Sequence, residues 1–178
     1  KYLVRDGRND YLETGSLMSI RKNVKDILIP SEERHLQMFP LDFEEFLWAL
    51  ENEQFMPLVA RCFAKKTPMG QALHRKGMDY YRQYMIVGGM PQAVNAYVES
   101  RDFTKVDQVK RDILALYRAD IAKHVAGCER KGTQIFDDIP AQLARHERRF
   151  RFSALRKGAA ARNYEDALFW LTDAMIVN

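Results

Sequence analysis

Hydrophobic residues recur along most of this chain at intervals of three and four positions, the spacing of an amphipathic helix. Asp42 opens one such run and Glu45 follows three positions later, so the pair predicts a capping box. The longest run covers residues 104–125, and Gly127 supplies its stop. Helices are also expected from Thr67–Pro68 to Gly88–Gly89, from Pro91 onward, and over residues 135–143, 152–155 and 164–171. The predicted fold class is therefore mostly α.

Short strands are expected only in the first part of the chain. Residues 11–16 have the pattern of a strand end running into a glycine turn, and residues 27–29 form an apolar segment stopped by Pro30. Residues 35–41 alternate loosely between polar and apolar. Because isolated strands are marginal in water without a partner layer, we expect residues 1–41 to be the edge of a larger sheet.

The composition favours compact folding. With 178 residues, of which 47% are hydrophobic and 29% charged, the chain is long enough for one or two units with an apolar core. The uncharged stretch Tyr84–Val98 is interrupted by Gly88, Gly89 and Pro91, and it falls short of the roughly 20 apolar residues that a membrane-spanning helix needs. No membrane partner is expected.

The first residue and the two cysteines bear on the origin of the chain and on its cellular location. Lys1 stands in place of Met and no leader follows it, so we expect a piece of a longer protein. Cys62 and Cys128 are too few for a disulfide framework and are typical of a reducing compartment, which predicts a cytoplasmic location. His124 and Cys128 have the spacing of two zinc ligands, but two further ligands are missing, so no metal site is expected.

The net charge of +4 is concentrated near the C-terminus. Residues 141–178 hold seven Lys or Arg against four Asp or Glu, which leaves +3 for this segment. Clustered guanidinium groups can neutralise nucleic-acid phosphates and release counterions. A solvated face, or arginines that pair with another domain, explains the cluster equally well. The candidate nucleic-acid-binding residues are Arg145, Arg148, Arg149, Arg151, Arg156, Lys157 and Arg162.

Catalytic chemistry is not encoded in an obvious form. The sequence contains no glycine-rich loop ending in Gly-Lys-Ser/Thr and no apolar strand ending in paired acidic residues, so this chain alone should not hydrolyse ATP. Residues 13–16 place small hydroxyl groups at the expected end of a strand, where they could orient a water against a terminal phosphate. An ordinary turn is the commoner use of such a tetrapeptide.

Seven phrases occur in an order that resembles a known family. The string resembles the prokaryotic AAA+-like P-loop ATPase family whose C-terminal half is a domain of unknown function with a winged-helix element. The resemblance covers essentially the whole chain. The phrases lie at residues 13–17, 29–31, 38–46, 84–94, 117–121, 139–143 and 164–171.

The resemblance implies three parts: residues 1–41 as the C-terminal remnant of an ATPase core, residues 42–127 as a helical lid, and residues 128–178 as a partial winged-helix unit. It makes Thr14, with Ser16 beside it, the candidate sensor of the γ-phosphate. ATP and Mg²⁺ would be held by a phosphate-binding loop and an acidic strand before Lys1, so this chain alone is expected to bind neither. The missing N-terminal ATPase half is thus one expected partner.

The predicted function is the C-terminal part of an ATP-dependent switch that is not catalytic by itself. ATP held upstream would be sensed through Thr14, and the lid helices would transmit its state to the basic C-terminal unit. Nucleic acid or another protein is the expected further partner. The alternative is a non-catalytic helical module that binds nucleic acid or protein.

Overall fold

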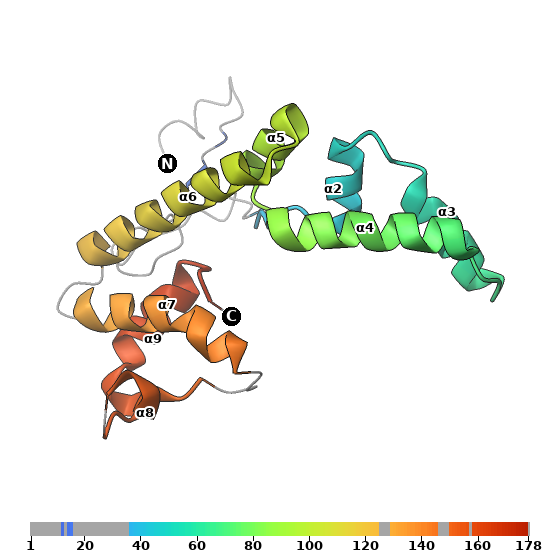
Figure 1. The fold of residues 1–178 in the computed structure, drawn as a ribbon. Helices are drawn as coiled ribbons and strands as arrows, with labels where there is room; N and C mark the ends of the chain where they lie inside the picture. The colour runs from blue at the N-terminus through green and yellow to red at the C-terminus, as the bar shows by residue number, and fades with distance from the viewer. Residues whose placement is uncertain are drawn as a thin grey trace, which may run out of the picture. The chain divides into compact units, whose positions relative to one another are not determined.

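The computed structural model describes residues 12, 14–15, 36–124, 129–145, 150–156 and 158–177. Over these ranges the chain is mostly helical and contains no strand, which confirms the predicted mostly α class (Figure 1). The elements are α2 (Phe43–Ala49), α3 (Phe55–Ala64), α4 (Gln71–Val87), α5 (Pro91–Ser100), α6 (Phe103–His124), α7 (Glu129–Ala144), α8 (Phe152–Leu155), the 3-10 helix η1 (Ala161–Asn163) and α9 (Glu165–Asp173).

The chain divides into two compact units. Leu36–Ala115 form the first, which we name the bundle unit, and Leu116–Asn178 belong to the second, which we name the C-terminal unit. The division falls inside α6, so this helix contributes its first half to one unit and its end to the other.

The capping box predicted at Asp42 is present. The Asp42 backbone N–H donates to Glu45 Oε2 and the Glu45 N–H donates to Asp42 Oδ1, each at 2.9 Å. The helix that follows ends at Ala49, and two residues later Glu51 adopts a left-handed φ of 61°. Its N–H donates to the Trp48 carbonyl and the Asn52 N–H donates to the Leu47 carbonyl, which is the Schellman pattern that ends a helix.

The core of the bundle unit is apolar and aromatic. The ring of Phe46, which is fully buried, lies with its centroid 5.4 Å from that of Tyr84 and 6.1 Å from that of Tyr97. These rings bring α2 against α4 and α5. The buried members of the cluster are Phe46, Leu50, Val87, Ala93, Val94, Tyr97 and Val106.

The turn between α4 and α5 holds the segment that enters α2. The Leu41 N–H donates to the Gly89 carbonyl at 2.8 Å, and the Tyr84 hydroxyl donates to the Leu41 carbonyl at 2.9 Å. Burial, with the carboxylates of Asp42 and Glu45, raises the pKa of Tyr84, which keeps the proton that this hydrogen bond uses. A Cβ on Gly89 would overlap the Leu41 carbonyl oxygen.

Gly89→Ala is therefore expected to destabilise the bundle unit by about 1–3 kcal/mol, because two backbone segments must separate to admit the methyl group. Urea unfolding followed by circular dichroism measures the change. Gln92→Ala, at an exposed position of the neighbouring helix, is the control and should stay within about 0.5 kcal/mol of the parent. Equal stabilities for the two variants would contradict the close approach.

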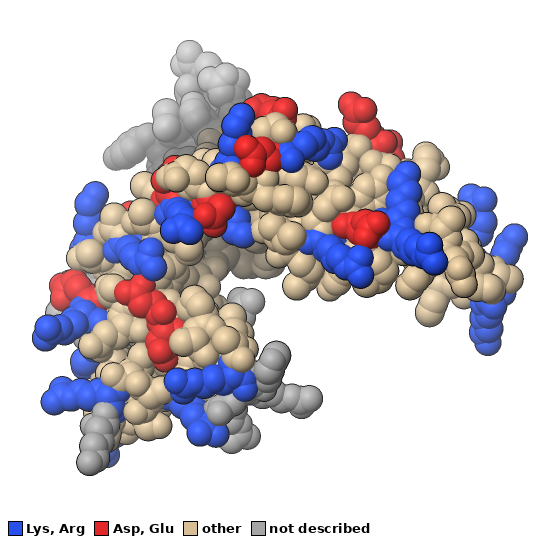
Figure 2. Space-filling view, viewed as in Figure 1, with Lys and Arg blue, Asp and Glu red and all other residues tan. Residues whose placement is uncertain are grey.

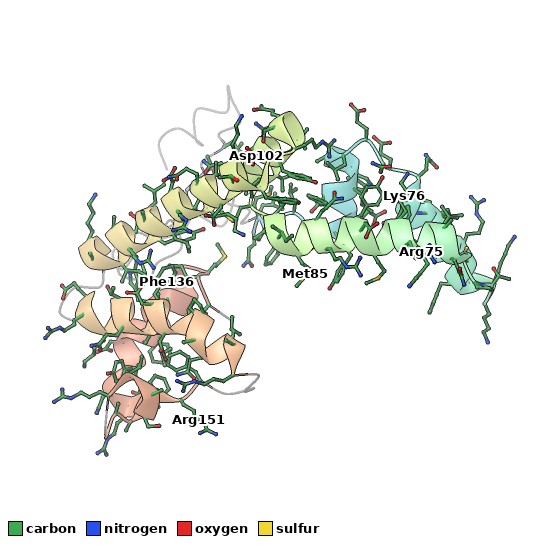
Figure 3. All side chains as sticks on the ribbon, viewed as in Figure 1. Arg75, Lys76, Met85, Asp102, Phe136 and Arg151 are labelled. Atoms are coloured by element: carbon green, nitrogen blue, oxygen red, sulfur yellow. The ribbon has the colours of Figure 1, made fainter. Side chains whose placement is uncertain are left out.

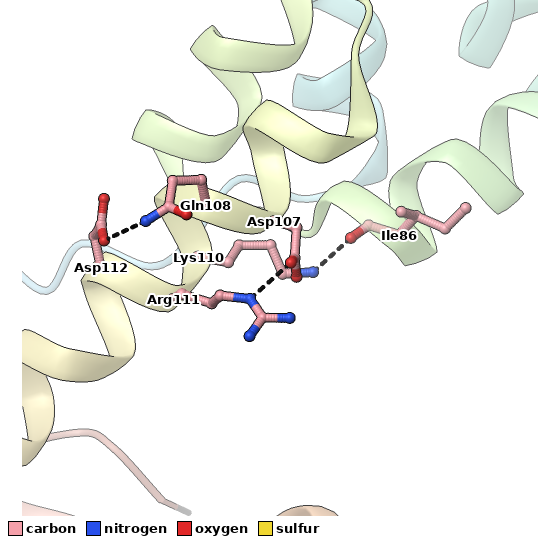
Figure 4. A network of polar contacts seen from close by, with 6 residues as sticks. All are labelled: Ile86, Asp107, Gln108, Lys110, Arg111 and Asp112. Carbon is pink, nitrogen blue, oxygen red and sulfur yellow. Dashed lines mark hydrogen bonds and ion pairs between the residues drawn. The ribbon is translucent and has the colours of Figure 1, made fainter.

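One polar contact joins α6 to the end of α4 within the bundle unit (Figure 4). The Lys110 ammonium donates to the Ile86 carbonyl at 2.6 Å, which satisfies a carbonyl in the last turn of α4. Along α6 itself, Arg111 pairs with Asp107 at 2.7 Å.

The C-terminal unit has its own core. Its buried side chains come from the end of α6, from α7 and from α9, and α7 packs against both α8 and α9. The Arg118 guanidinium pairs with Asp137 at 2.8 Å and lies over the ring of Phe136. The buried members of the core are Ile121, Ile135, Phe136, Tyr164, Ala167, Trp170, Leu171 and Ala174.

Two local predictions were wrong, and a third gave too late a start: α7 begins at Glu129, before the helix predicted over residues 135–143. Residues 36–41 form no strand: Leu36, Met38 and Phe39 are exposed, and the Leu41 N–H is bonded to a turn instead of a neighbouring strand. The helix expected to start at Thr67–Pro68 begins at Gln71, after a glycine whose φ of 81° places it outside helical geometry. Of the strand predicted at 11–16 only residues 12, 14 and 15 are described, without strand structure, and residues 27–29 lie outside the described residues.

Candidate nucleic-acid interface

The arginine-rich segment of the C-terminal unit lies around α8. Four of its seven predicted residues are described and all four are exposed. Arg145 follows α7, Arg151 and Arg156 flank α8, and Arg162 lies in η1. The other three, Arg148, Arg149 and Lys157, lie outside the described residues.

Three of these arginines differ from three other arginines of the chain in whether the guanidinium group contacts an aspartate. Arg82, Arg111 and Arg118 each contact an aspartate at 2.7–2.8 Å. Within the part of the chain that the structure describes, Arg145, Arg156 and Arg162 form no ion pair with any carboxylate. All three are also exposed, which favours contact with an anion from outside the chain. We name Arg145, Arg151, Arg156 and Arg162 the arginine segment.

A buried glutamine fixes the backbone of this segment. Gln142 is 5% exposed, and its side-chain amide oxygen, Oε1, accepts a hydrogen bond from the Arg151 backbone N–H at 3.1 Å. Its amide nitrogen donates to the Arg151 carbonyl at 3.1 Å and to an Asp138 carboxylate oxygen at 2.6 Å. The glutamine thus pairs with one residue much as a neighbouring strand would, and it holds the chain entering α8 against α7. Figure 3 labels Arg151 at this position.

The aromatic residues interleaved with the arginines serve the fold. Phe150 and Phe152 are partly buried, with ring centroids 5.1 Å apart, and Phe152 lies 5.5 Å from the ring of Tyr164. The two rings meet edge to face, and both pack against the core of the C-terminal unit. They therefore position α8 instead of offering an open stacking surface.

A basic hollow lies beside α8. It has a volume of about 380 Å³, and its lining contains the cations Lys131 and Arg156 and no carboxylate. Lys131 lies over the ring of Tyr164, and Gly158 adopts a φ of 78°. A hollow with two cations and an uncharged amide favours an anion such as a phosphate group. The lining residues are Lys131, Arg156, Gly158, Ala159, Asn163 and Tyr164.

The remaining predicted sites are not brought together. Thr14 is exposed and without regular structure, and Ser16 lies outside the described residues. Cys128 and the side chain of His124 lie outside them as well. No three His, Cys, Asp or Glu side chains of the described ranges gather as a metal site would require.

The sequence reasoning missed a second basic surface, at the end of the bundle unit. Residues 61–76 run from the last turn of α3 into the first turns of α4 and contain no Asp or Glu. The absence of Asp and Glu from residues 61–76 could have revealed this surface. The net charge was counted over much longer segments, in which this short basic run is not visible. We name this surface the α3–α4 tip. Its exposed cations are Arg61, Lys65, Lys66, Arg75 and Lys76.

Fold and surface define the class: a mostly α-helical protein of two compact units, with exposed arginines on the second, of which Arg145, Arg156 and Arg162 have no carboxylate partner among the described residues. Residues 78–178 match the model of a family described as a domain of unknown function, DUF8612, and the chain belongs to this family. No curated protein and no solved structure matches the chain. Among the described helices, none is long and apolar enough to cross a membrane.

Proposed function

We propose that this chain is the non-catalytic, C-terminal part of an ATP-dependent AAA+-like switch in the cytoplasm, and that its C-terminal unit binds duplex nucleic acid through the arginine segment. The observation that carries the binding proposal is the pairing state of Arg145, Arg156 and Arg162. All three are exposed, and no described carboxylate neutralises them.

The order of the helices in the C-terminal unit is the support for the winged-helix part of the proposal. The short helix α8 and the following α9 both belong to the unit organised on α7, as in the winged-helix element that the resemblance implies. Glu165 and Asp166 lie in the first turn of α9, where their charges would repel phosphates. We therefore assign the phosphate contacts to the residues that flank α8 and to η1, and not to the start of α9.

Nucleotide chemistry is assigned to the partner half of the switch. Thr14 is the proposed sensor and is exposed. Because the sequence contains no phosphate-binding loop, the proposal expects no ATP to be bound by this chain alone. The proposal places ATP and Mg²⁺ on the upstream ATPase core, of which residues 1–41 would be the last part. A full-length product that binds no ATP in the presence of Mg²⁺ would refute the switch and leave the binding module.

The salt dependence of binding tests the arginine segment. We expect the logarithm of the affinity of the chain for a fluorescent DNA duplex, measured by anisotropy, to fall linearly with the logarithm of the salt concentration. Arg156→Gln/Arg162→Gln should reduce the slope by about 1.8, because each phosphate contact on a duplex contributes about 0.9. The weakening should be similar for duplexes of different sequence, because phosphate contacts carry no sequence information.

Arg82→Gln/Arg111→Gln is the matched control. It removes the same two charges from exposed arginines that already contact Asp79 and Asp107. The slope should stay that of the parent. Equal losses for the two double variants would mean that only net charge matters, and the assignment of the site to the arginine segment would be wrong.

A further inference from the structure

The α3–α4 tip presents five cations on a surface without a carboxylate of its own. Arg61, Lys65, Lys66, Arg75 and Lys76 are all exposed. Figure 2 shows blue side chains gathered where α3 ends and α4 begins, and Figure 3 labels Arg75 and Lys76 on α4. Lys76 lies over the ring of Tyr80. The other four form no ion pair with the residues that the structure describes.

The backbone conformation at the end of α3 determines where the lysines of the tip lie. Lys66 adopts a left-handed φ of 52° and its N–H donates to the Phe63 carbonyl at 3.1 Å. The Thr67 N–H donates to the Cys62 carbonyl at 3.0 Å, which completes a Schellman motif. The lysines therefore follow an ordered helix end and do not stand in an irregular loop.

An aromatic side chain stands among these cations. Phe63 is 86% exposed, the largest exposed fraction of any aromatic residue among those described. Its ring has no aromatic partner in this part of the chain, whereas Phe43, Phe46 and Phe55 each face a tyrosine. The ring is thus open to a partner from outside the chain.

We infer that the α3–α4 tip binds single-stranded nucleic acid, with its lysines and arginines on the phosphates and the ring of Phe63 stacked on a base. Cationic side chains beside an open aromatic face are the combination that single strands use, because unpaired bases offer their faces for stacking. This site lies on the bundle unit and does not depend on the arginine segment of the C-terminal unit.

An anionic membrane surface fits the tip less well. Interfacial binding strengthens with the apolar area that enters the bilayer. Within residues 61–76, which are all described, Phe63 is alone in exposing a large apolar side chain by more than half. One ring among five cations suits a base better than a lipid layer.

The test measures binding of a labelled oligo-dT to the whole chain carrying Arg156→Gln/Arg162→Gln, which removes two of the four arginines of the other proposed site. In this background, Lys65→Gln/Arg75→Gln should reduce the slope of log affinity against log salt by about 1.4, since each single-strand phosphate contact contributes about 0.7. Phe63→Ala should weaken binding at least about fivefold at fixed salt and leave the slope unchanged.

Controls separate the tip from general effects. Arg82→Gln/Arg111→Gln removes two charges of the bundle unit from paired arginines and should leave affinity and slope unchanged. Circular dichroism should show parental helix content in every variant, because the substituted side chains are exposed.

Two results would overturn the inference. One is an affinity that Phe63→Ala leaves unaltered, because stacking would then be absent. The other is tip-dependent binding to vesicles containing phosphatidylserine with none to the oligonucleotide, which would assign the surface to lipid. Because the tip substitutions are compared within a background that already lacks Arg156 and Arg162, and duplex binding is measured separately, failure here and failure of the duplex-binding proposal are separate outcomes.

Discussion

Leu171→Ala is expected to lower the free energy of unfolding of the C-terminal unit by about 2–5 kcal/mol. Leu171 has no exposed surface and lies in the core to which α6, α7 and α9 contribute. Removing its branched end leaves a cavity among side chains held on three helices, and such a cavity closes only in part. A unit of this size has little stability in reserve, so its unfolding should become detectable at room temperature.

The two tryptophans make this effect measurable within one unit. Trp170 is buried in the C-terminal unit, and Trp48 belongs to the bundle unit. In a Trp48→Phe background, the emission of Trp170 alone should shift to longer wavelength at a lower urea concentration in Leu171→Ala. Leu143→Ala is the matched control: the same substitution at a site 69% exposed should change stability by no more than about 0.5 kcal/mol. Coincident curves for the two variants would show that α9 is not packed as described.

Phe46→Ala should destabilise the bundle unit by about 3–5 kcal/mol. The ring fills the space between Tyr84 and Tyr97, so its loss removes apolar burial and two aromatic contacts together. Nuclear magnetic resonance of the methyl groups of Val87 and Val94, which share this core, should report the loss of packing in the bundle unit.

Phe63→Ala is the control for this variant. The chemical change is the same, but the ring is 86% exposed and does not belong to the core. We expect the methyl spectrum and the unfolding midpoint of Phe63→Ala to remain parental. If Phe46→Ala leaves the spectrum equally unaltered, the aromatic core of α2, α4 and α5 has been assigned wrongly.

Helix positions were predicted where a side chain or a glycine supplies a local signal. Asp42 with Glu45 marked the start of α2, Gly88 marked the end of α4, and residues 152–155 were predicted with the bounds that α8 has. The break between α2 and α3 was missed because Glu51 occupies the left-handed position that glycine usually takes. A glutamate carries no such signal in sequence.

The candidate site was predicted only in part. A run of arginines indicates a basic segment, but Arg118 and Arg156 look alike in sequence. In the structure, Arg118 pairs with Asp137 from α7, nineteen residues away, and Arg156 has no described carboxylate partner. The role of Gln142 was invisible for the same reason, since its partner Arg151 is brought to it by the packing of α8 on α7.

The sequence by itself determined the helical class, most helix ends and the location of positive charge near the C-terminus, because periodicity, caps and charge counts depend on neighbours along the chain. The tertiary structure alone decided which rings meet Phe46, which arginines contact a carboxylate among the described residues and that Phe63 is largely exposed. These properties depend on contacts between residues distant in sequence, and such contacts exist only once the helices have packed.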